Sequence, residues 1–276
     1  MDKNKLINDT LASLEVDREF RYYGTIEKDV KEIIKLCKRV IFPIMFIEKQ
    51  HKDVNKEIKD SLEQLYVLLK DVIKYTDTDV NFDTVITNLF NSFKVIRSEL
   101  VADSEFAFLN DPAAHSCKEI LLSYPSFRAL ILYRISHVLY KNEAFVLSRI
   151  IMEEVHKITG IDIHPGANID SPFFIDHGTG VVIGETTNIG KRVKIYQGVT
   201  LGAKSFPLDE DGNPIKGIKR HPDIEDDVVI YANATILGGN TVIKKGSVIG
   251  ANAWITETVD ENSVVGHHKE AKDEQE

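Results

Sequence analysis

The first 160 residues carry apolar side chains at the spacing of amphipathic helices. Apolar positions recur every three or four residues, which places them on one face of a helix. The stripes span residues 26–41, 58–73, 82–96, 127–139 and 147–158. Pro125 separates two of these segments, and Gly160 is suited to end the last one. Such stripes bury against each other or against a partner subunit, so they predict a helical domain and not a ligand site.

After Gly160 the spacing of the apolar residues changes to six. The apolar positions in register are Ile163, Ile169, Ile175, Val181, Ile189, Ile195, Leu201, Ile224, Ile230, Ile236, Val242, Val248 and Trp254, with an octet at 181–188. A branched aliphatic every six residues is typical of a parallel β-helix built from hexapeptides. Each hexapeptide forms a short strand and a turn, three of them close one triangular coil, and the aliphatics point to the axis. The pattern therefore predicts a β-prism with these residues inside.

The six-residue period is interrupted once, between Ala203 and Pro222. Residues 207–214 are dense in turn-forming residues, so we expect a loop extruded from one corner of the prism. The predicted layout is a helical domain at 1–160, a β-helix at 161–260 and a charged tail without fixed structure at 261–276. Because almost no linker separates the first two, the last helix should dock directly on the first coil.

Composition narrows the class of protein. The net charge is −9, which argues against a nucleic-acid surface. The two cysteines lie far apart without a metal-ligand spacing, which favours a reducing compartment and no disulfide framework. The N-terminus lacks the apolar core of a signal peptide. The longest early apolar run, 40–47, is shorter than the about 20 residues that span a bilayer. We expect a cytoplasmic protein that binds neither nucleic acid nor membrane.

Histidines and aspartates beside the inward residues are the candidates for chemistry. Ile163 and Ile175 point inward, so His164 and His177 point outward. The same coil brings Asp162, Asp176 and His177 near one another. An Asp beside a His is the usual arrangement for a general base, because the carboxylate fixes the tautomer of the ring. By contrast, Asp111 and Pro112 together favour the N-cap of a following helix.

Several ordered motifs carry a family resemblance. They are Asp-Pro-Ala-Ala (111–114), Tyr-Pro-Ser-Phe-Arg-Ala (124–129), Tyr-Arg-Ile-Ser-His (133–137), Asp-Ile-His-Pro-Gly-Ala (162–167), Ile-Asp-His-Gly-Thr-Gly (175–180), Val-Ile-Gly-Glu-Thr (182–186), Val-Thr-Leu-Gly (199–202) and Arg-His-Pro (220–222). This set closely resembles serine O-acetyltransferase, of the hexapeptide-repeat acyltransferase superfamily. The match runs over about 111–254, and the first hundred residues match only in helical character. The resemblance implies an α+β fold, with an all-helical domain followed by a left-handed parallel β-helix with one extruded loop.

The resemblance also implies roles for individual residues. His177 matches the general base that deprotonates the serine hydroxyl, and Asp162 matches the carboxylate that orients it. By the same resemblance, Asp111 and Asp176 are expected to bind the amino group of serine, and Arg220 and His221 its carboxylate. The residues expected to contact acetyl-CoA, in the groove between adjacent prisms, are Gly202, Ala203, Ala232 and Lys219. Asp111 thereby gains a role that its local sequence does not show. The helical domain is expected to serve oligomerisation and to supply part of the serine site.

The implied reaction is direct acetyl transfer from acetyl-CoA to L-serine, giving O-acetylserine for cysteine biosynthesis. It needs no metal and no permanently bound cofactor, and a backbone N–H is expected to hold the oxyanion. The architecture implies a homotrimer or a dimer of trimers, and the family implies feedback inhibition by L-cysteine. Two features depart from many members, namely Ala203 in place of a glycine and a longer loop at 204–219. Residues 272–276 contain no terminal isoleucine, so a stable complex with O-acetylserine sulfhydrylase is not expected.

Three other functions fit parts of the pattern. A hexapeptide acetyltransferase for a sugar hydroxyl would have no use for Asp111 or Arg220, because a sugar has no ammonium or carboxylate group. A zinc hydro-lyase of the γ-carbonic anhydrase type needs three converging histidines, whereas His164 and His177 are thirteen residues apart. A non-catalytic trimeric scaffold would not depend on His177.

Overall fold

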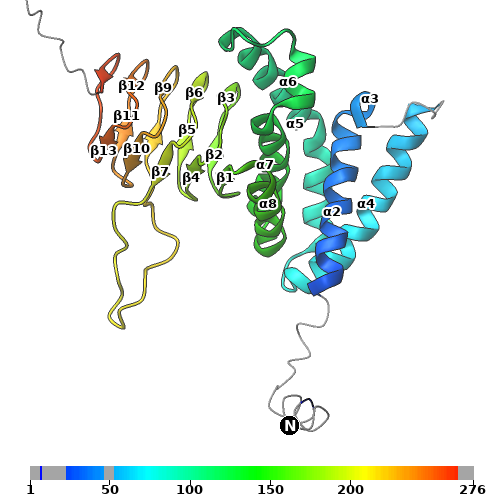
Figure 1. The fold of residues 1–276 in the computed structure, drawn as a ribbon. Helices are drawn as coiled ribbons and strands as arrows, with labels where there is room; N and C mark the ends of the chain where they lie inside the picture. The colour runs from blue at the N-terminus through cyan, green and yellow to red at the C-terminus, as the bar shows by residue number, and fades with distance from the viewer. Residues whose placement is uncertain (1–6, 8–22, 47–52, 267–276) are drawn as a thin grey trace, which may run out of the picture.

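The structure is a computed structural model that describes residue 7, residues 23–46 and residues 53–266. Within these residues the helices come first and the strands follow, so that two domains lie end to end (Figure 1). The last helix ends at Thr159 and the first strand begins at Asp162, so the helical domain passes into the strands without a linker. The predicted fold class, a helical domain followed by a parallel β-helix with one extruded loop, is confirmed.

Polar caps and buried stripes define the helices. They are α2 (Tyr23–Ile41), α3 (Pro43–Phe46), α4 (Val54–Thr76), α5 (Phe82–Asn110), α6 (Cys117–Ser123), α7 (Pro125–Lys141) and α8 (Phe145–Thr159). The side chains of Asp53, Asn81 and Ser116 each accept a hydrogen bond from a backbone N–H of the first turn. Gly160 ends α8 in the left-handed conformation, as predicted. The predicted stripe residues are buried or half-buried, except that Ile158 is 55% exposed. Within the described ranges no helix has the length and apolar character needed to cross a membrane.

Short parallel strands form the three faces of the prism. They are β1 (Asp162–Ile163), β2 (Asn168–Ile169), β3 (Phe173–Ile175), β4 (Val182–Ile183), β5 (Asn188–Ile189), β6 (Val193–Ile195), β7 (Thr200–Gly202), β8 (Asp223–Ile224), β9 (Val229–Ile230), β10 (Thr235–Leu237), β11 (Val242–Ile243), β12 (Val248–Ile249), β13 (Trp254–Ile255) and β14 (Val264–Val265). Face A holds β1, β4, β7, β10 and β13. Face B holds β2, β5, β8 and β11, and face C holds β3, β6, β9, β12 and β14. Each coil therefore visits the faces in the order A, B, C.

The predicted inward register holds through Ile236 and is wrong in the last coils. There Ile243 pairs with Ile224, and Ile255 pairs with Ile236. The step from the inward Ile236 to the inward Ile243 is seven residues instead of six, and a one-residue slip exchanges the inner and outer faces of a strand. Val242 and Val248 therefore point outward, and Trp254 is 69% exposed on face A.

The octet also lies elsewhere than predicted. Ile183 pairs with both Ile163 and Leu201 on face A, so the long step runs from Ile175 to Ile183 and not over 181–188. Val181 is fully buried, but it precedes the strand instead of heading it. The extra residues are accommodated in the corner that leads from face C to face A. That corner contains His177.

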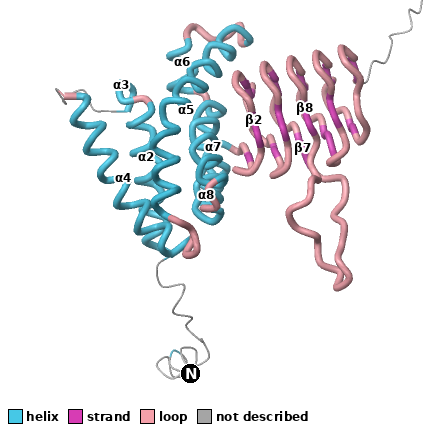
Figure 2. Tube along the Cα trace, turned by 180° about the vertical axis from the view of Figure 1, so that it is seen from behind, coloured by secondary structure: helices cyan, strands magenta, loops and turns pink. Residues whose placement is uncertain are grey.

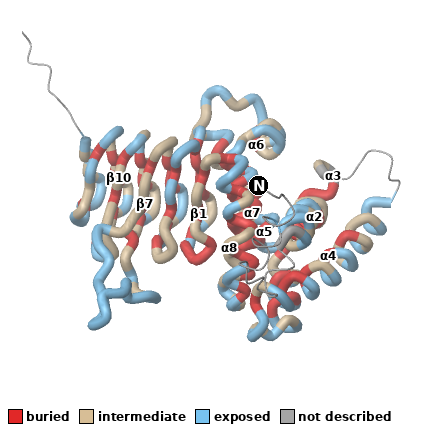
Figure 3. Tube along the Cα trace, turned by 60° about the horizontal axis from the view of Figure 1, so that its bottom comes forward, coloured by how far each residue is buried: buried red, intermediate tan, exposed pale blue. Residues whose placement is uncertain are grey.

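The prism ends later than predicted, and its loop lies where predicted. Strand β14 pairs with β12 beyond residue 260, so residues 261–265 complete a coil and do not belong to a tail. Residues 267–276 of the expected tail lie outside the described residues. The loop at 203–222 leaves the prism between β7 and β8 and projects away from it (Figure 2). Strands β3 and β6 are buried throughout, the other strands up to β12 bury only their inward residue, and most of the loop is exposed (Figure 3).

A buried ion pair joins the helical domain to the first coil. Arg134 of α7 donates to both carboxylate oxygens of Asp103 of α5, at 3.0 and 2.7 Å from Nη2. Asp103 Oδ1 also accepts hydrogen bonds from the Phe173 backbone N–H and the Ser171 hydroxyl, both at 2.9 Å. Because a buried charge is stable only when it is paired and hydrogen-bonded, this network holds the α5 helix against the corner before β3. The C-terminal end of α5 is thus positioned beside face C.

Candidate functional site

His177 lies on a strained corner between faces C and A. Its backbone is left-handed, with φ at +58°, and Gly178 follows with φ at +96°. A Cβ atom at Gly178 would lie 2.5 Å from Ile161 Cδ1, so only glycine fits there. The His177 side chain is 72% exposed. Arg192, Asp227, Asn233, Asn252 and Asn262 have the same left-handed φ in the prism, so this backbone conformation recurs in the β-helix and does not by itself mark a site.

Asp111 reaches the same corner from the helical domain. It is the C-cap of α5, and its carboxylate accepts hydrogen bonds from the Tyr124 hydroxyl at 2.5 Å and the Ala113 N–H at 2.9 Å. The predicted N-cap role is wrong, because Ser116 caps α6 and Pro112 prevents α5 from continuing. The hydrogen bond from Tyr124 lowers the pKa of Asp111, and the nearby charges of Lys194 and His177 add to the effect. Asp111 is therefore held as a carboxylate near His177.

Asp176 completes this group. One of its carboxylate oxygens lies 3.9 Å from His177 Nε2, and the other lies 3.4 Å from Lys194 Nζ. Asp176 and Lys194 are both largely buried, with side chains 13% and 10% exposed. We call Asp111, Tyr124, Asp176, His177 and Lys194 the His177 cluster. It presents two carboxylates beside an exposed imidazole, an arrangement that can bind a cationic group next to a base.

A second group lies on the corner between faces A and B. There His221 is 8% exposed, and its Nδ1 is 3.1 Å from the Thr186 N–H and 2.9 Å from the Thr186 hydroxyl. Burial, with the charge of Arg220, lowers the pKa of His221 to about 4. The ring is therefore neutral near pH 7. Since Nδ1 accepts a hydrogen bond from Thr186, the proton of the ring is on Nε2, and the Nε2–H group can donate a hydrogen bond to an anion.

Glu185 holds the guanidinium of Arg220. The Arg220 Nη2 is ion-paired with Glu185 Oε2, and Glu185 Oε1 accepts from the Tyr140 hydroxyl at 2.6 Å. Burial alone would raise the pKa of Glu185, but the hydrogen bonds from Tyr140 and Arg220 keep it below its usual range. We call Tyr140, Glu185, Thr186, Arg220 and His221 the Arg220 cluster. Its cation and neutral imidazole suit a carboxylate ligand.

The other predicted residues lie around face A. Asp162 points outward at the start of β1, half-buried, and among the described residues no hydrogen bond or ion pair engages its side chain. Gly202 and Ala203 lie at the edge of face A where the loop begins, and Ala232 lies on the opposite edge. Lys219 donates to the Thr186 carbonyl at 2.5 Å and to Asp223 at 2.6 Å.

The two clusters lie at opposite edges of face A. The His177 corner leads into β4, and the corner with Glu185 and Thr186 leads out of it. Neither a hydrogen bond nor an ion pair joins the clusters within the described chain, and none joins Asp162 to His177. The predicted serine-binding residues therefore form two half-sites. Within the described residues, moreover, no three His, Cys, Asp or Glu side chains gather as metal ligands.

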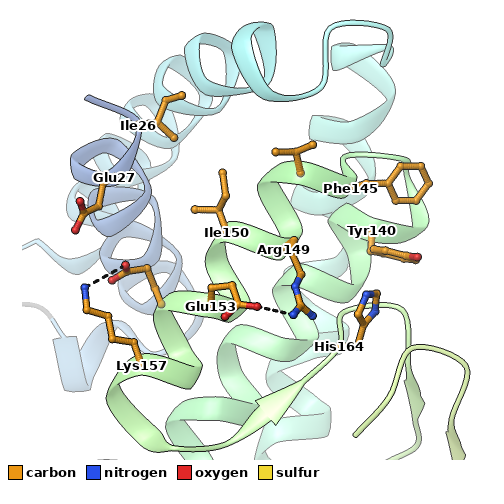
Figure 4. Close-up of a pocket in the computed structure, with 11 residues that line it drawn as sticks. Ile26, Glu27, Tyr140, Phe145, Arg149, Ile150, Glu153, Lys157 and His164 are labelled. Atoms are coloured by element: carbon orange, nitrogen blue, oxygen red, sulfur yellow. Dashed lines mark ion pairs between the residues drawn. The ribbon is translucent and has the colours of Figure 1, made fainter. Parts of the chain in front are cut away.

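A large pocket lies elsewhere, between α2, α8 and the turn after β1. Its volume is about 710 Å³, and its lining includes Phe145, Arg149 and Ile150 of α8 together with His164 (Figure 4). Arg149 is ion-paired with Glu153 at its wall. Burial lowers the pKa of His164, whose Nδ1 accepts from the Gly166 N–H at 3.0 Å. The pocket lining includes Tyr140 of the Arg220 cluster and the candidate His164, but none of the residues assigned to catalysis, serine or acetyl-CoA.

Known relatives agree on one family. A plasmid-encoded serine acetyltransferase of Synechococcus elongatus is 58% identical over 170 residues, which cover 62% of this chain and 53% of that protein. The chain thus spans about half the length of that relative. The serine acetyltransferase of Bacillus licheniformis is 44% identical over 173 residues, 63% of this chain and 74% of the relative. The chain belongs to the serine acetyltransferase family. No protein-family model matches it.

The family assignment extends to the three-dimensional structure. The crystal structure of serine acetyltransferase isoform 3 from Entamoeba histolytica, in complex with cysteine, superposes with a TM-score of 0.76 at 40% identity. The superposition covers 85% of this chain and 80% of that one. The family is one of acyltransferases.

Sequence reasoning missed five members of these half-sites, namely Tyr124, Tyr140, Glu185, Thr186 and Lys194. Tyr140 follows the 133–137 motif on α7. Tyr124, Glu185 and Thr186 lie inside the quoted motifs, but their neighbours in sequence do not reveal their hydrogen-bond partners. Lys194 lies outside the motifs, in a strand whose flanking residues Val193 and Ile195 are fully buried. From the sequence alone, a lysine at an outward strand position is predicted to be exposed to solvent. Only its burial under α5 could have singled it out.

Proposed function

We propose that this chain transfers the acetyl group of acetyl-CoA to the hydroxyl of L-serine. The observation that carries the proposal is the pair of carboxylates, Asp111 and Asp176, beside the exposed imidazole of His177. An amino acid brings an ammonium group to such a pair and places its side-chain hydroxyl within reach of the base. The membership of the serine acetyltransferase family supports serine as the acceptor.

The chemistry follows from these groups. Asp111 and Asp176 bind the serine ammonium, while Arg220 and the Nε2–H of His221 bind its carboxylate. His177 removes the hydroxyl proton as the oxygen attacks the thioester carbonyl, and a backbone N–H stabilises the tetrahedral oxyanion. When the C–S bond breaks, the imidazolium protonates the coenzyme A thiolate. The products are O-acetylserine and coenzyme A, and no acyl-enzyme forms.

Because the two half-sites lie at opposite edges of face A, the site is composite. In a homotrimer the His177 cluster of one chain faces the Arg220 cluster of the next. Asp162 lies on face A between these edges and orients the His177 ring in the assembled groove. Gly202, Ala203, Ala232 and Lys219 line the same groove for the acetyl-CoA arm, which runs between neighbouring prisms.

L-Cysteine has the same ammonium and carboxylate groups as serine. The Entamoeba histolytica relative binds cysteine in its crystal structure, which supports the same ligand here. We expect L-cysteine to compete with serine for both half-sites.

A thiol-release assay with acetyl-CoA tests the activity. L-Serine is expected to release coenzyme A well above the rates with threonine, homoserine and a galactoside. A higher rate with the galactoside would instead favour a sugar acceptor. An absence of release with every acceptor would refute acetyl transfer.

Mixed trimers test the composite site. At serine concentrations well below the wild-type KM, His177→Ala and Arg220→Ala chains are each expected to show little activity, the first because turnover is lost and the second because the KM for serine is raised. The two variants are then denatured and refolded together. In the mixed trimers, some interfaces join the intact His177 of the Arg220→Ala chain to the intact Arg220 of the His177→Ala chain, and these sites should regain activity. If the mixture stays as inactive as the separate variants, the two half-sites belong to one chain.

A further inference from the structure

Lys194 is a buried lysine on the outward side of strand β6. It is only 8% exposed, although its position in the strand points away from the prism axis. The rings of Phe174 and Tyr196 lie 5.2 and 4.6 Å from its Nζ. The end of α5 lies over it. Burying an ammonium group is costly unless it is paired and hydrogen-bonded, so its contacts indicate why it is retained there.

The Lys194 ammonium joins the two domains at the His177 cluster. It donates to the Asn110 carbonyl at 2.8 Å and lies 3.4 Å from an Asp176 oxygen. Asn110 is the last residue of α5, so a cation there also satisfies a free carbonyl at the helix terminus. Asn110 directly precedes Asp111. One side chain therefore sets the position of both carboxylates, Asp111 through the backbone and Asp176 directly.

The ionised groups around Lys194 carry an excess of one negative charge. Asp111 and Asp176 supply two negative charges, and Lys194 offsets one of them. The Tyr124 hydroxyl and the Ala113 N–H already hold Asp111, whereas Asp176 Oδ1 faces His177. A second ammonium group beside the pair would balance the remaining negative charge of the three ionised groups.

We propose that Lys194 is a positioning residue for the ammonium group of serine. It holds the α5 terminus and Asp176 so that the two carboxylates converge on the substrate. This inference rests on the proposed function and deepens it, because it makes amino-group recognition depend on how the two domains are joined. Two other roles are distinguishable: Lys194 could compete with the substrate ammonium for Asp176, or it could only stabilise the fold.

Steady-state kinetics of Lys194→Met separates these roles. Methionine keeps the contacts with the aromatic rings but removes the charge. The KM for serine is expected to rise at least about tenfold, the size of effect that a lost hydrogen bond to a charged group gives. The KM for acetyl-CoA should change by no more than about twofold. Lys194→Arg should restore part of the serine affinity, and Lys244→Met, which removes the exposed pair with Asp260, should leave both constants unchanged.

A double-mutant cycle tests whether Lys194 acts through Asp176. In an Asp176→Asn background, Lys194→Met should raise the KM for serine much less than it does alone. Calorimetric titration with L-serine should show the same pattern of affinity losses without turnover. A lower KM for serine in Lys194→Met would identify a competitor, and equal changes for both substrates with a lower Tm would identify a purely structural residue. Either result overturns the proposal.

The same experiments separate failure of this inference from failure of the proposed function. If wild-type protein acetylates serine and Lys194→Met keeps its serine constants, only the role of Lys194 is refuted. If wild-type protein neither binds nor acetylates serine, both are refuted.

Discussion

Two histidines at opposite edges of face A differ mainly in their burial. His177 is 72% exposed on a left-handed corner, whereas His221 is 8% exposed against Thr186. Burial and the charge of Arg220 lower the pKa of His221 to about 4, so that ring serves as a neutral donor near pH 7. The His177 ring has solvent around it and carboxylates beside it. The same side chain is therefore suited to proton transfer at one edge and to anion recognition at the other.

The two clusters also differ in how they are assembled. The His177 cluster combines residues from α5, from the segment before α7 and from face C, so it exists only when the domains are docked. The Arg220 cluster depends mostly on two neighbouring coils, where Glu185 and Thr186 hold Arg220 and His221. The variants below test this contrast, in order of the effect expected.

His177→Ala should have the largest effect. Removing a general base lowers turnover by about 10²–10⁴-fold. Trimer formation should persist, because the ring is exposed and makes no packing contact in the core. The kcat from the thiol-release assay and the particle size by light scattering check this. His156→Ala, which removes an exposed histidine of α8, is the matched control, and turnover within a few-fold of wild type for His177→Ala would contradict its role as base.

Arg220→Ala should weaken binding of the substrate carboxylate more than it slows turnover. A lost charge-assisted hydrogen bond raises the KM for serine by about 10- to 100-fold, with little change for acetyl-CoA. Steady-state kinetics with each substrate varied in turn measures both constants. Equal losses for the two substrates would move Arg220 from serine recognition to a structural role.

Gly184→Ala should disturb the Arg220 cluster although it replaces none of the charged residues. A Cβ atom at Gly184 would lie 2.1 Å from His221 Cδ2, so the imidazole must move away from Thr186. We expect the KM for serine to rise by about tenfold, as for loss of one hydrogen bond to a charged group. In a His221→Ala background the same substitution should add little. If Gly184→Ala raises the KM for serine by the same factor in that background, its effect does not act through His221.

Tyr124→Phe should have the smallest effect, and it should appear mainly at acidic pH. Its hydrogen bond is the main cause of the lowered pKa of Asp111, so the variant should raise that pKa toward the ordinary value. Asp111 binds an ammonium group only when ionised. The affinity for L-serine, measured by calorimetric titration as a function of pH, should therefore begin to fall at a higher pH in the variant, while the rate above pH 7 changes by only a few-fold. An unchanged pH dependence of the affinity would mean that Asp111 does not govern serine binding at low pH.

Much of the architecture was predictable because it rests on local periodicity. The spacing of apolar residues predicted the helical stripes, the prism and its loop, and Gly160 predicted the end of α8. Periodicity failed where the step between inward residues was longer than six. The seven-residue step from Ile236 to Ile243 left Trp254 exposed, and the long step from Ile175 to Ile183 placed the irregular corner at His177. Turn lengths depend on contacts between coils, which no single repeat encodes.

Residue types and motifs predicted the candidate chemistry near His177, because an Asp-His pair and the family resemblance can both be recognised from the sequence alone. Only the tertiary structure decided that Asp111 ends a helix instead of starting one, and that Lys194 is buried beneath that helix end. It also decided that the residues predicted to bind serine divide between two edges of face A. Each of these outcomes depends on groups far apart in the chain being brought within hydrogen-bond distance, and the energies of such contacts arise only once the two domains are packed together.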